Sequence, residues 1–161
     1  MARYFMSGEQ TLILIADSAL TVTSNSATVQ RNWIYELTMG NVGTPADLVS
    51  IYLFGKVTAE NSANMTIITA TKLDEADRAP QALVGSNHTG EPTYTNTVVS
   101  LATPTNGDLL RIPLNHRATY RWVAPPGGSL VTPAVSGDGI GGKSDHASAV
   151  TDYMMGAHWE E

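Results

Sequence analysis

The stretch LVSIYLF, residues 48–54, is nearly all apolar and is rich in β-branched and aromatic side chains. A short run of this composition is typical of a central β-strand that is covered on both faces. Similar runs lie on both sides of it, at residues 12–15, 65–69 and 119–123, and Gly, Pro, Asn and Asp separate them. This rhythm predicts an all-β chain: an antiparallel β-sandwich or jelly-roll-like fold with about eight short strands and one long loop.

Alternating residues predict which side chains face the core. In residues 117–124 the alternation places Ala118, Tyr120 and Trp122 inward. In residues 32–38 it places Trp33, Tyr35 and Leu37 on one face, with Ile34 as the exception.

The C-terminal stretch, residues 147–159, can be written as a helix or as a strand. We favour a strand, because β-favouring residues dominate it and Gly156 lies inside it. As a strand, its common face carries Ala149, Thr151, Tyr153, Met155, Ala157 and Trp159.

Turn residues predict one hairpin and one long loop. Asn106-Gly107 lies between the expected strands 97–103 and 108–114, and Asn-Gly is favoured in such turns because both residues tolerate positive φ. Residues 72–92 are expected to form the long loop, which we interpret as the variable segment that faces a partner.

The length of 161 residues predicts one domain, which we place at residues 11–161. Residues 1–10 are expected to be an N-terminal arm or an edge segment. In the first case Tyr4, Phe5 and Met6 are candidate partner-binding residues that dock on another subunit.

The charge balance disfavours several function classes. The net charge is −6 with nine Lys and Arg, which form no cluster, whereas nucleic-acid binding requires clustered cations. No apolar run approaches the roughly 18 residues of a membrane span, and the N-terminus does not have the pattern of a signal peptide. We therefore expect neither nucleic acid nor membrane as a partner. The chain has no cysteine, so disulfides and thiolate metal sites are absent.

One motif matches the phosphate-binding P-loop, G-x-x-x-x-G-K-[ST]. It runs from Gly137 to Ser144 and includes Gly142 and Lys143. A functional P-loop follows a buried parallel strand and opens a helix, whereas this chain is patterned for antiparallel sheets. We interpret the match as chance and the segment as a flexible glycine loop, and we expect no cofactor.

Other candidate chemistry is weak. Ser144, Asp145 and His146 are adjacent, whereas a catalytic triad needs side chains that converge from separate segments. The four histidines lie in different segments without the spacing of a metal site, so no metal is expected. The acidic group at residues 74–77 is interpreted as a solvated patch. The aromatic residues Trp33, Tyr120, Trp122 and Trp159 could line a sugar platform, but their pattern favours a core role.

Residues 117–128 (RATYRWVAPPGG), 130–134, 139–141 and 158–161 (HWEE) resemble small virion proteins of tailed bacteriophages, and most of all their capsid decoration, or cement, proteins. The resemblance implies a non-enzymatic β-sandwich or jelly-roll subunit, often trimeric, on the outer surface of the capsid. Its partners would be the major capsid protein and further copies of itself as a homotrimer, and it would be made in the host cytoplasm. The alternatives are a head fibre, neck or tail component, or a β-sandwich carbohydrate-binding module.

Overall fold

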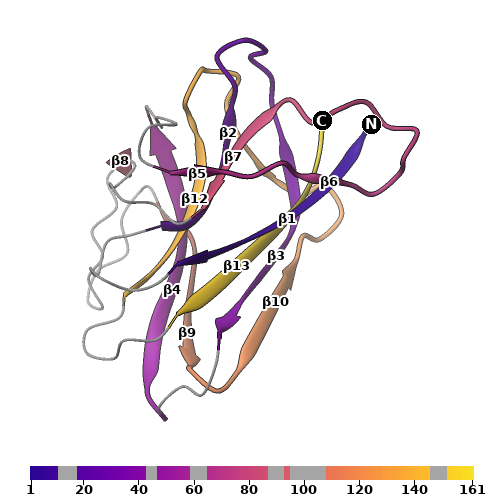
Figure 1. Ribbon diagram of the computed structural model, residues 1–161. Coiled ribbons are helices and arrows are strands. Elements are labelled where there is room, and N and C mark those ends of the chain that lie inside the picture. The colour runs from indigo at the N-terminus through magenta and orange to yellow at the C-terminus, as the bar shows by residue number, and fades with distance from the viewer. Residues whose placement is uncertain (11–17, 43–46, 59–64, 87–92, 95–107, 146–151) are drawn as a thin grey trace.

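The protein is an antiparallel β-sandwich. The computed structural model describes residues 1–10, 18–42, 47–58, 65–86, 93–94, 108–145 and 152–161, and every regular element in these ranges is a β-strand (Figure 1). In these ranges no helix could cross a membrane. The strands are β1 (Arg3–Gln10), β2 (Ser18–Ser24), β3 (Trp33–Asn41), β4 (Val49–Thr58), β5 (Thr66–Ile67), β6 (Thr71–Lys72), β7 (Ala82–Ser86), β8 (Thr93–Tyr94), β9 (Asp108–Asn115), β10 (Thr119–Val123), β11 (Leu130–Val131), β12 (Gly139–Asp145) and β13 (Tyr153–Glu160).

The strands form two sheets. Sheet A has the order β10-β3-β13-β1-β6, and β11 also pairs with β3. Sheet B has the order β5-β7-β2-β12-β4-β8, and β9 also pairs with β4. The all-β sandwich is therefore confirmed, but about eight strands was too low a number. Four of the strands, β5, β6, β8 and β11, have two residues each, which is too short to leave a pattern in the sequence.

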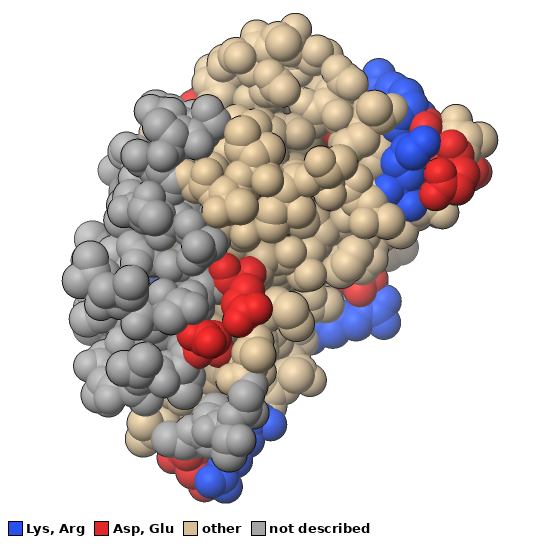
Figure 2. Space-filling view, in the orientation of Figure 1, with Lys and Arg blue, Asp and Glu red and all other residues tan. Residues whose placement is uncertain are grey.

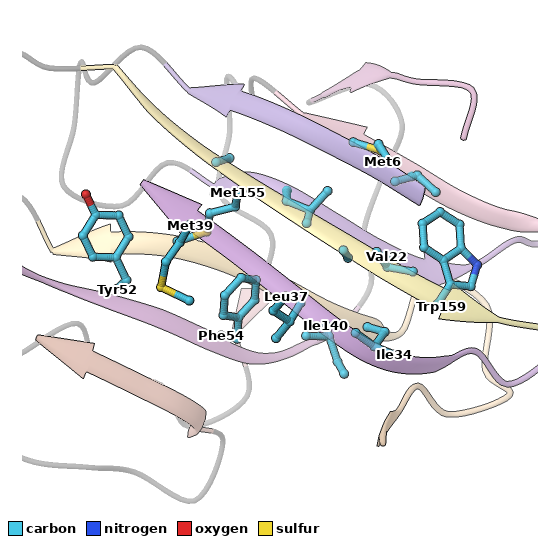
Figure 3. Close-up of a cluster of buried hydrophobic side chains, with 14 of the residues drawn as sticks. Met6, Val22, Ile34, Leu37, Met39, Tyr52, Phe54, Ile140, Met155 and Trp159 are labelled. Atoms are coloured by element: carbon cyan, nitrogen blue, oxygen red, sulfur yellow. The ribbon is translucent and has the colours of Figure 1, made fainter. Parts of the chain in front are cut away.

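The inward faces of the two sheets enclose one apolar core (Figure 3). Strand β13 lies in the middle of sheet A, between β3 and β1, and contributes every second side chain to this core. Tyr153, Met155, Ala157 and Trp159 are all fully buried, whereas the intervening Met154 is 45% exposed. The predicted strand is therefore confirmed over residues 153–159; residues 147–151 lie outside the described part of the chain.

A bulge in β3 corrects the predicted alternation of that strand. Opposite β13, Glu36 pairs with His158 and Ile34 pairs with Trp159, so Tyr35 is an extra residue without a partner in the register. An extra residue reverses the faces of everything beyond it. Ile34 is fully buried beside Leu37, whereas Trp33 and Tyr35, which were expected to share Leu37's face, remain partly exposed.

The N-terminal residues belong to the sandwich. β1 pairs with β13 along its whole length and with β6 at Tyr4 and Phe5. Tyr4 and Met6 are 0% and 3% exposed, in this chain's own core. The expected docking arm is wrong for these two residues, because alternation in β1 turns them inward and leaves Phe5 as the half-buried residue on the outer face.

The expected long loop at 72–92 is also corrected. Residues 82–86 form β7, which pairs with β2 in sheet B. The glycine and polar residues of this segment resemble a loop in composition, although they include a strand in which Val84 is buried. Only residues 73–81 form an irregular connection, and residues 87–92 lie outside the described ranges. In the predicted hairpin, the second strand is present as β9, which pairs with β4. Its expected first strand, residues 97–103, is not described.

The side chain of the last residue, Glu161, lies at one end of the sandwich, where the two termini are side by side (Figure 1). Glu161 has a fully buried side chain that accepts hydrogen bonds from the backbone N–H groups of Gln81 and Ala82 at 2.9–3.0 Å. Arg78 lies 3.7 Å from the same carboxylate, and its backbone carbonyl accepts a hydrogen bond from Tyr4. This arrangement fixes the connection after β6 against the two terminal strands.

Candidate binding face

The outer face of sheet A carries a patch of mostly small, neutral residues with a charged residue at the end of each row. Register places Ser7, Gly156 and Thr38 side by side across β1, β13 and β3, with Arg121 of β10 at the end of this row. The next row runs from Glu9 through Met154 and Gly40 to Thr119. We call the six neutral residues of these two rows the sheet A platform; Ser7, Thr38, Met154 and Thr119 are accessible, and the two glycines are buried between them. In Figure 2 most of the described surface is neutral, but a group of Asp and Glu atoms lies near the middle of the view, where β1, β13 and β3 cross in Figure 1.

Two glycines, Gly40 and Gly156, allow the neighbouring side chains of the platform to lie close to the backbone. A Cβ atom on Gly156 would lie 2.6 Å from the Thr38 Oγ1, and one on Gly40 would lie 3.0 Å from the Thr119 methyl group. Beside Gly40 is a depression of about 260 Å³ that Thr38, Thr119, Arg121 and Met154 line. A mostly neutral surface with a shallow hollow and a charged border suits contact with another protein over a broad area.

One border of the platform is a cluster of charged and aromatic side chains that we call the Glu36 cluster: Phe5, Tyr35, Glu36, Arg121 and His158. The guanidinium of Arg121 donates two hydrogen bonds to the carboxylate of Glu36, at 2.7 and 2.6 Å. The His158 ring stacks on Phe5 with a centroid distance of 4.4 Å, and Tyr35 lies 6.0 Å away. The His158 Nδ1 is 3.6 Å from a Glu36 oxygen.

The electrostatics of this cluster favour binding over proton transfer. The hydrogen bonds from Arg121 lower the pKa of Glu36, so its carboxylate is a weak base. Burial lowers the pKa of His158, although Glu36 acts in the opposite direction. Both shifts favour a charged Glu36 and a neutral His158 at neutral pH, and the two hydrogen bonds from Arg121 hold the carboxylate in place.

The P-loop-like string is a central strand. Residues 139–145 form β12, which pairs with β2 on one side and β4 on the other. Its backbone groups serve these two ladders, whereas a P-loop needs amides that converge on a phosphate. Lys143 is 3% exposed, and the Ser144 hydroxyl donates to the Ile51 carbonyl at 3.4 Å. The expected flexible loop is wrong, because Gly139 and Gly142 are needed for close packing.

Gly142 shows this need most directly. A Cβ atom there would lie 2.4 Å from the sulfur of Met155 and 2.7 Å from the ring of Phe54, both in the core. Gly142 therefore lets sheet B approach sheet A, whereas Gly139 allows close contact with β2 of its own sheet. Gly137, at the start of the motif, has a φ of +77° in the turn before β12.

The structure reveals one Ser–His contact that the sequence did not indicate. The Ser50 Oγ lies 2.6 Å from the His116 Nε2, although 66 residues separate them in the chain. Asn41 donates to the His116 carbonyl and accepts from Tyr52, which extends the network between the two sheets. Ser50 is 4% and His116 is 2% exposed, so an acyl substrate cannot reach the hydroxyl. We assign the network a structural role.

The two remaining candidates that the sequence raised, a sugar platform and a metal site, are not assembled in the described part of the chain. Trp159 is fully buried and packs on Tyr4 at 5.7 Å, so the four aromatics do not form a sugar platform. In the described ranges no three His, Cys, Asp or Glu residues come together as metal ligands. His88 and His146 lie outside those ranges.

Comparison with protein families, with curated proteins and with solved structures finds no match to this chain. The function is therefore argued from its residues and their arrangement.

Proposed function

We propose that this chain is a non-enzymatic virion protein of tailed bacteriophages, and that it binds the outer capsid lattice as a decoration protein. The observation that carries the proposal is the sheet A platform, a patch of neutral residues across four strands of one sheet that Glu9 and Arg121 border. It is supported by the resemblance of residues 117–128, 130–134, 139–141 and 158–161 to such proteins. Part of the resembling sequence, β10 and the end of β13, borders the platform.

The physical logic is that of repeated weak contacts. A capsid presents the same surface many times, so a symmetric oligomer gains avidity without a strong individual site. The neutral Ser and Thr side chains cost less to desolvate than charged ones, and Glu9 and the Glu36 cluster at the borders supply charge for orientation. We propose a homotrimer that uses the platform to contact the major capsid protein on the outside of the head.

The test combines light scattering with cosedimentation on heads of the phage whose genome encodes the chain. The proposal expects a trimer that sediments with the heads. Met154→Lys puts a charge into the platform and should lower head binding at least tenfold without changing the melting temperature. Val49→Lys is the matched control, because Val49 is 65% exposed in sheet B and should tolerate the charge. A monomer that does not bind heads contradicts the proposal, and binding to tails alone would assign the chain to the tail.

A further inference from the structure

A cleft at one end of the sandwich is lined by two cations, Arg31 and Lys56, that form no ion pair with the described residues. The cleft has a volume of about 350 Å³ and lies where the end of β4, the start of β12 and the segment after β11 meet. This volume is in the range of small ligand sites. Its lining residues are Arg31, Lys56, Val57, Thr58, Val131, Thr132, Pro133, Asp138 and Gly139.

The distribution of ion pairs makes this cleft distinctive. The chain has nine Lys and Arg. Six of them lie within 4.0 Å of a carboxylate, and Lys143 has an interaction of its own. Arg31 and Lys56 are the remaining two, and neither makes an ion pair with any residue that the structure describes. Both are exposed, and both line the same cleft.

The walls of the cleft are fixed by buried polar contacts. Ser24 is fully buried, and its hydroxyl contacts the backbone carbonyls of Gln30 and Pro133, the latter at 2.8 Å. The backbone N–H of Ser24 donates to the Asp138 carbonyl at 3.1 Å. Ser24 therefore ties together the three segments that carry Arg31, Pro133 and Asp138, so the cleft is preorganised.

A second set of hydrogen bonds holds the backbone next to Arg31. The next residue, Asn32, is fully buried, and its backbone N–H donates to the Thr132 Oγ1 at 2.9 Å. The Thr132 N–H donates back to the Asn32 carbonyl at 3.0 Å. These contacts hold the backbone beside Arg31 against the segment around Thr132, and the backbone of Lys56 is held in β4, opposite Ile140 of β12.

We propose that this cleft binds a carboxylate of an acidic peptide segment from a partner protein. Arg31, Lys56 and Asp138 together give the lining a formal charge of +1, which complements a single carboxylate better than a phosphate dianion. The guanidinium can donate a pair of hydrogen bonds to the carboxylate, and Lys56 adds a point charge. Val131 and Pro133 are exposed at the cleft and provide an apolar contact for the neighbouring peptide side chain.

Other anions fit less well. A nucleic-acid backbone would need more than two cations and would meet a chain of net charge −6. Among the described residues no aromatic side chain lines the cleft, so they offer no stacking surface for a sugar ring. This inference goes beyond the capsid role. It does not depend on the sheet A platform, because the cleft and the platform have no residue in common.

The experiment is a titration of the 15N-labelled full chain followed by NMR. The probe is a blocked tetrapeptide, acetyl-Ala-Glu-Val-Ala-amide, and the control replaces its Glu with Gln. We expect shifts confined to amides near residues 31, 56–58, 131–133 and 138–139, with the Glu peptide binding at least tenfold more tightly than the Gln peptide. Equal affinity for the two peptides, or shifts elsewhere, would overturn the proposal.

Charge-removing variants distinguish binding at the cleft from nonspecific attraction between the peptide and positive charges elsewhere on the chain. Arg31→Gln and Lys56→Gln should each weaken binding of the Glu peptide about ten- to hundredfold, as expected for a charge-assisted hydrogen bond. Arg117→Gln removes the same charge from an exposed surface pair with Asp47 and should change affinity less than twofold. A third titration, with inorganic phosphate, tests which class of anion binds. If phosphate changes the amide shifts at the cleft and the Glu peptide does not, the carboxylate assignment is contradicted. Head binding is scored separately, so either proposal can fail alone.

Discussion

The two faces of strand β13 differ in what they determine. Its inner face carries Tyr153, Met155, Ala157 and Trp159, all fully buried between the sheets. Its outer face carries Met154 and Gly156 of the platform, His158 of the Glu36 cluster, and Glu160, which pairs with Arg3. The inner face stabilises the sandwich through packed apolar area, whereas the outer face contributes less to folding and is available for contact with a partner. Fold and binding are thus divided between neighbouring residues of one strand.

The largest expected effect comes from the inner face. Trp159→Ala removes a fully buried indole that packs on Tyr4 and donates to Glu161 at 3.2 Å. We expect a loss of about 3 to 5 kcal/mol in the free energy of unfolding, from lost burial and a residual cavity. Urea denaturation followed by circular dichroism measures this loss.

The control for this prediction is Met154→Ala, five residues away on the same strand and on the outer face. Because Met154 is 45% exposed, we expect a change of about 0.5 kcal/mol or less. Equal losses in the two variants would contradict the division between the faces of β13.

A smaller effect tests the glycines of the chance P-loop. Gly142→Ala should destabilise the fold by about 1 to 3 kcal/mol, because its methyl group would overlap the buried Met155 sulfur and the Phe54 ring. Gly40→Ala is the matched change on the outer face, where the nearest atom is a methyl group of the exposed Thr119 at 3.0 Å, and it should alter stability by less than about 0.5 kcal/mol. The urea midpoints of both variants give the comparison. A neutral Gly142→Ala would mean that close sheet packing does not explain this glycine.

The inner faces were the predictable part of this molecule. Alternation at residues 153–159 indicated the strand and its buried side correctly, because burial imposes a period of two on side chains. The prediction failed at Ile34, since a bulge at Tyr35 leaves no local pattern. It also failed at residues 139–145, where glycines that permit close packing resembled those of a phosphate loop.

The candidate sites could not be predicted in the same way. The Glu36 cluster combines residues 5, 35, 36, 121 and 158, and the cleft combines residues from four separate segments. Sheet order, which sets these neighbours, depends on long-range pairing that a single sequence does not display. The partner-binding residues Tyr4, Phe5 and Met6 illustrate the limit: they are adjacent in sequence, but only Phe5 reaches the outer face.

The smallest effect is a pH dependence on the outer face. Burial lowers the pKa of His158 below its ordinary value of 6.5, so the unfolded chain binds this proton more readily than the folded one. Stability should therefore fall as the pH drops from about 6.5 toward the folded pKa. For Glu36, the hydrogen bonds from Arg121 lower the pKa below 4.5, so its stabilising contribution is present above that pH and is lost as the pH falls through the folded pKa.

Two variants show which residue causes the loss of stability in each of these two pH ranges. In His158→Asn the loss of stability just below pH 6.5 should shrink, and in Glu36→Gln the loss below pH 4.5 should shrink. Urea midpoints at pH 7.5, 5.5 and 3.5 measure both, with Glu75→Gln as a control because Glu75 has a 96% exposed side chain at 4.0 Å from Lys72. The two groups are also coupled, since the charge of Glu36 raises the pKa of His158. NMR titration of the His158 ring should therefore give a lower pKa in Glu36→Gln than in the parent chain, and an unchanged pKa would contradict the 3.6 Å contact as the source of the coupling.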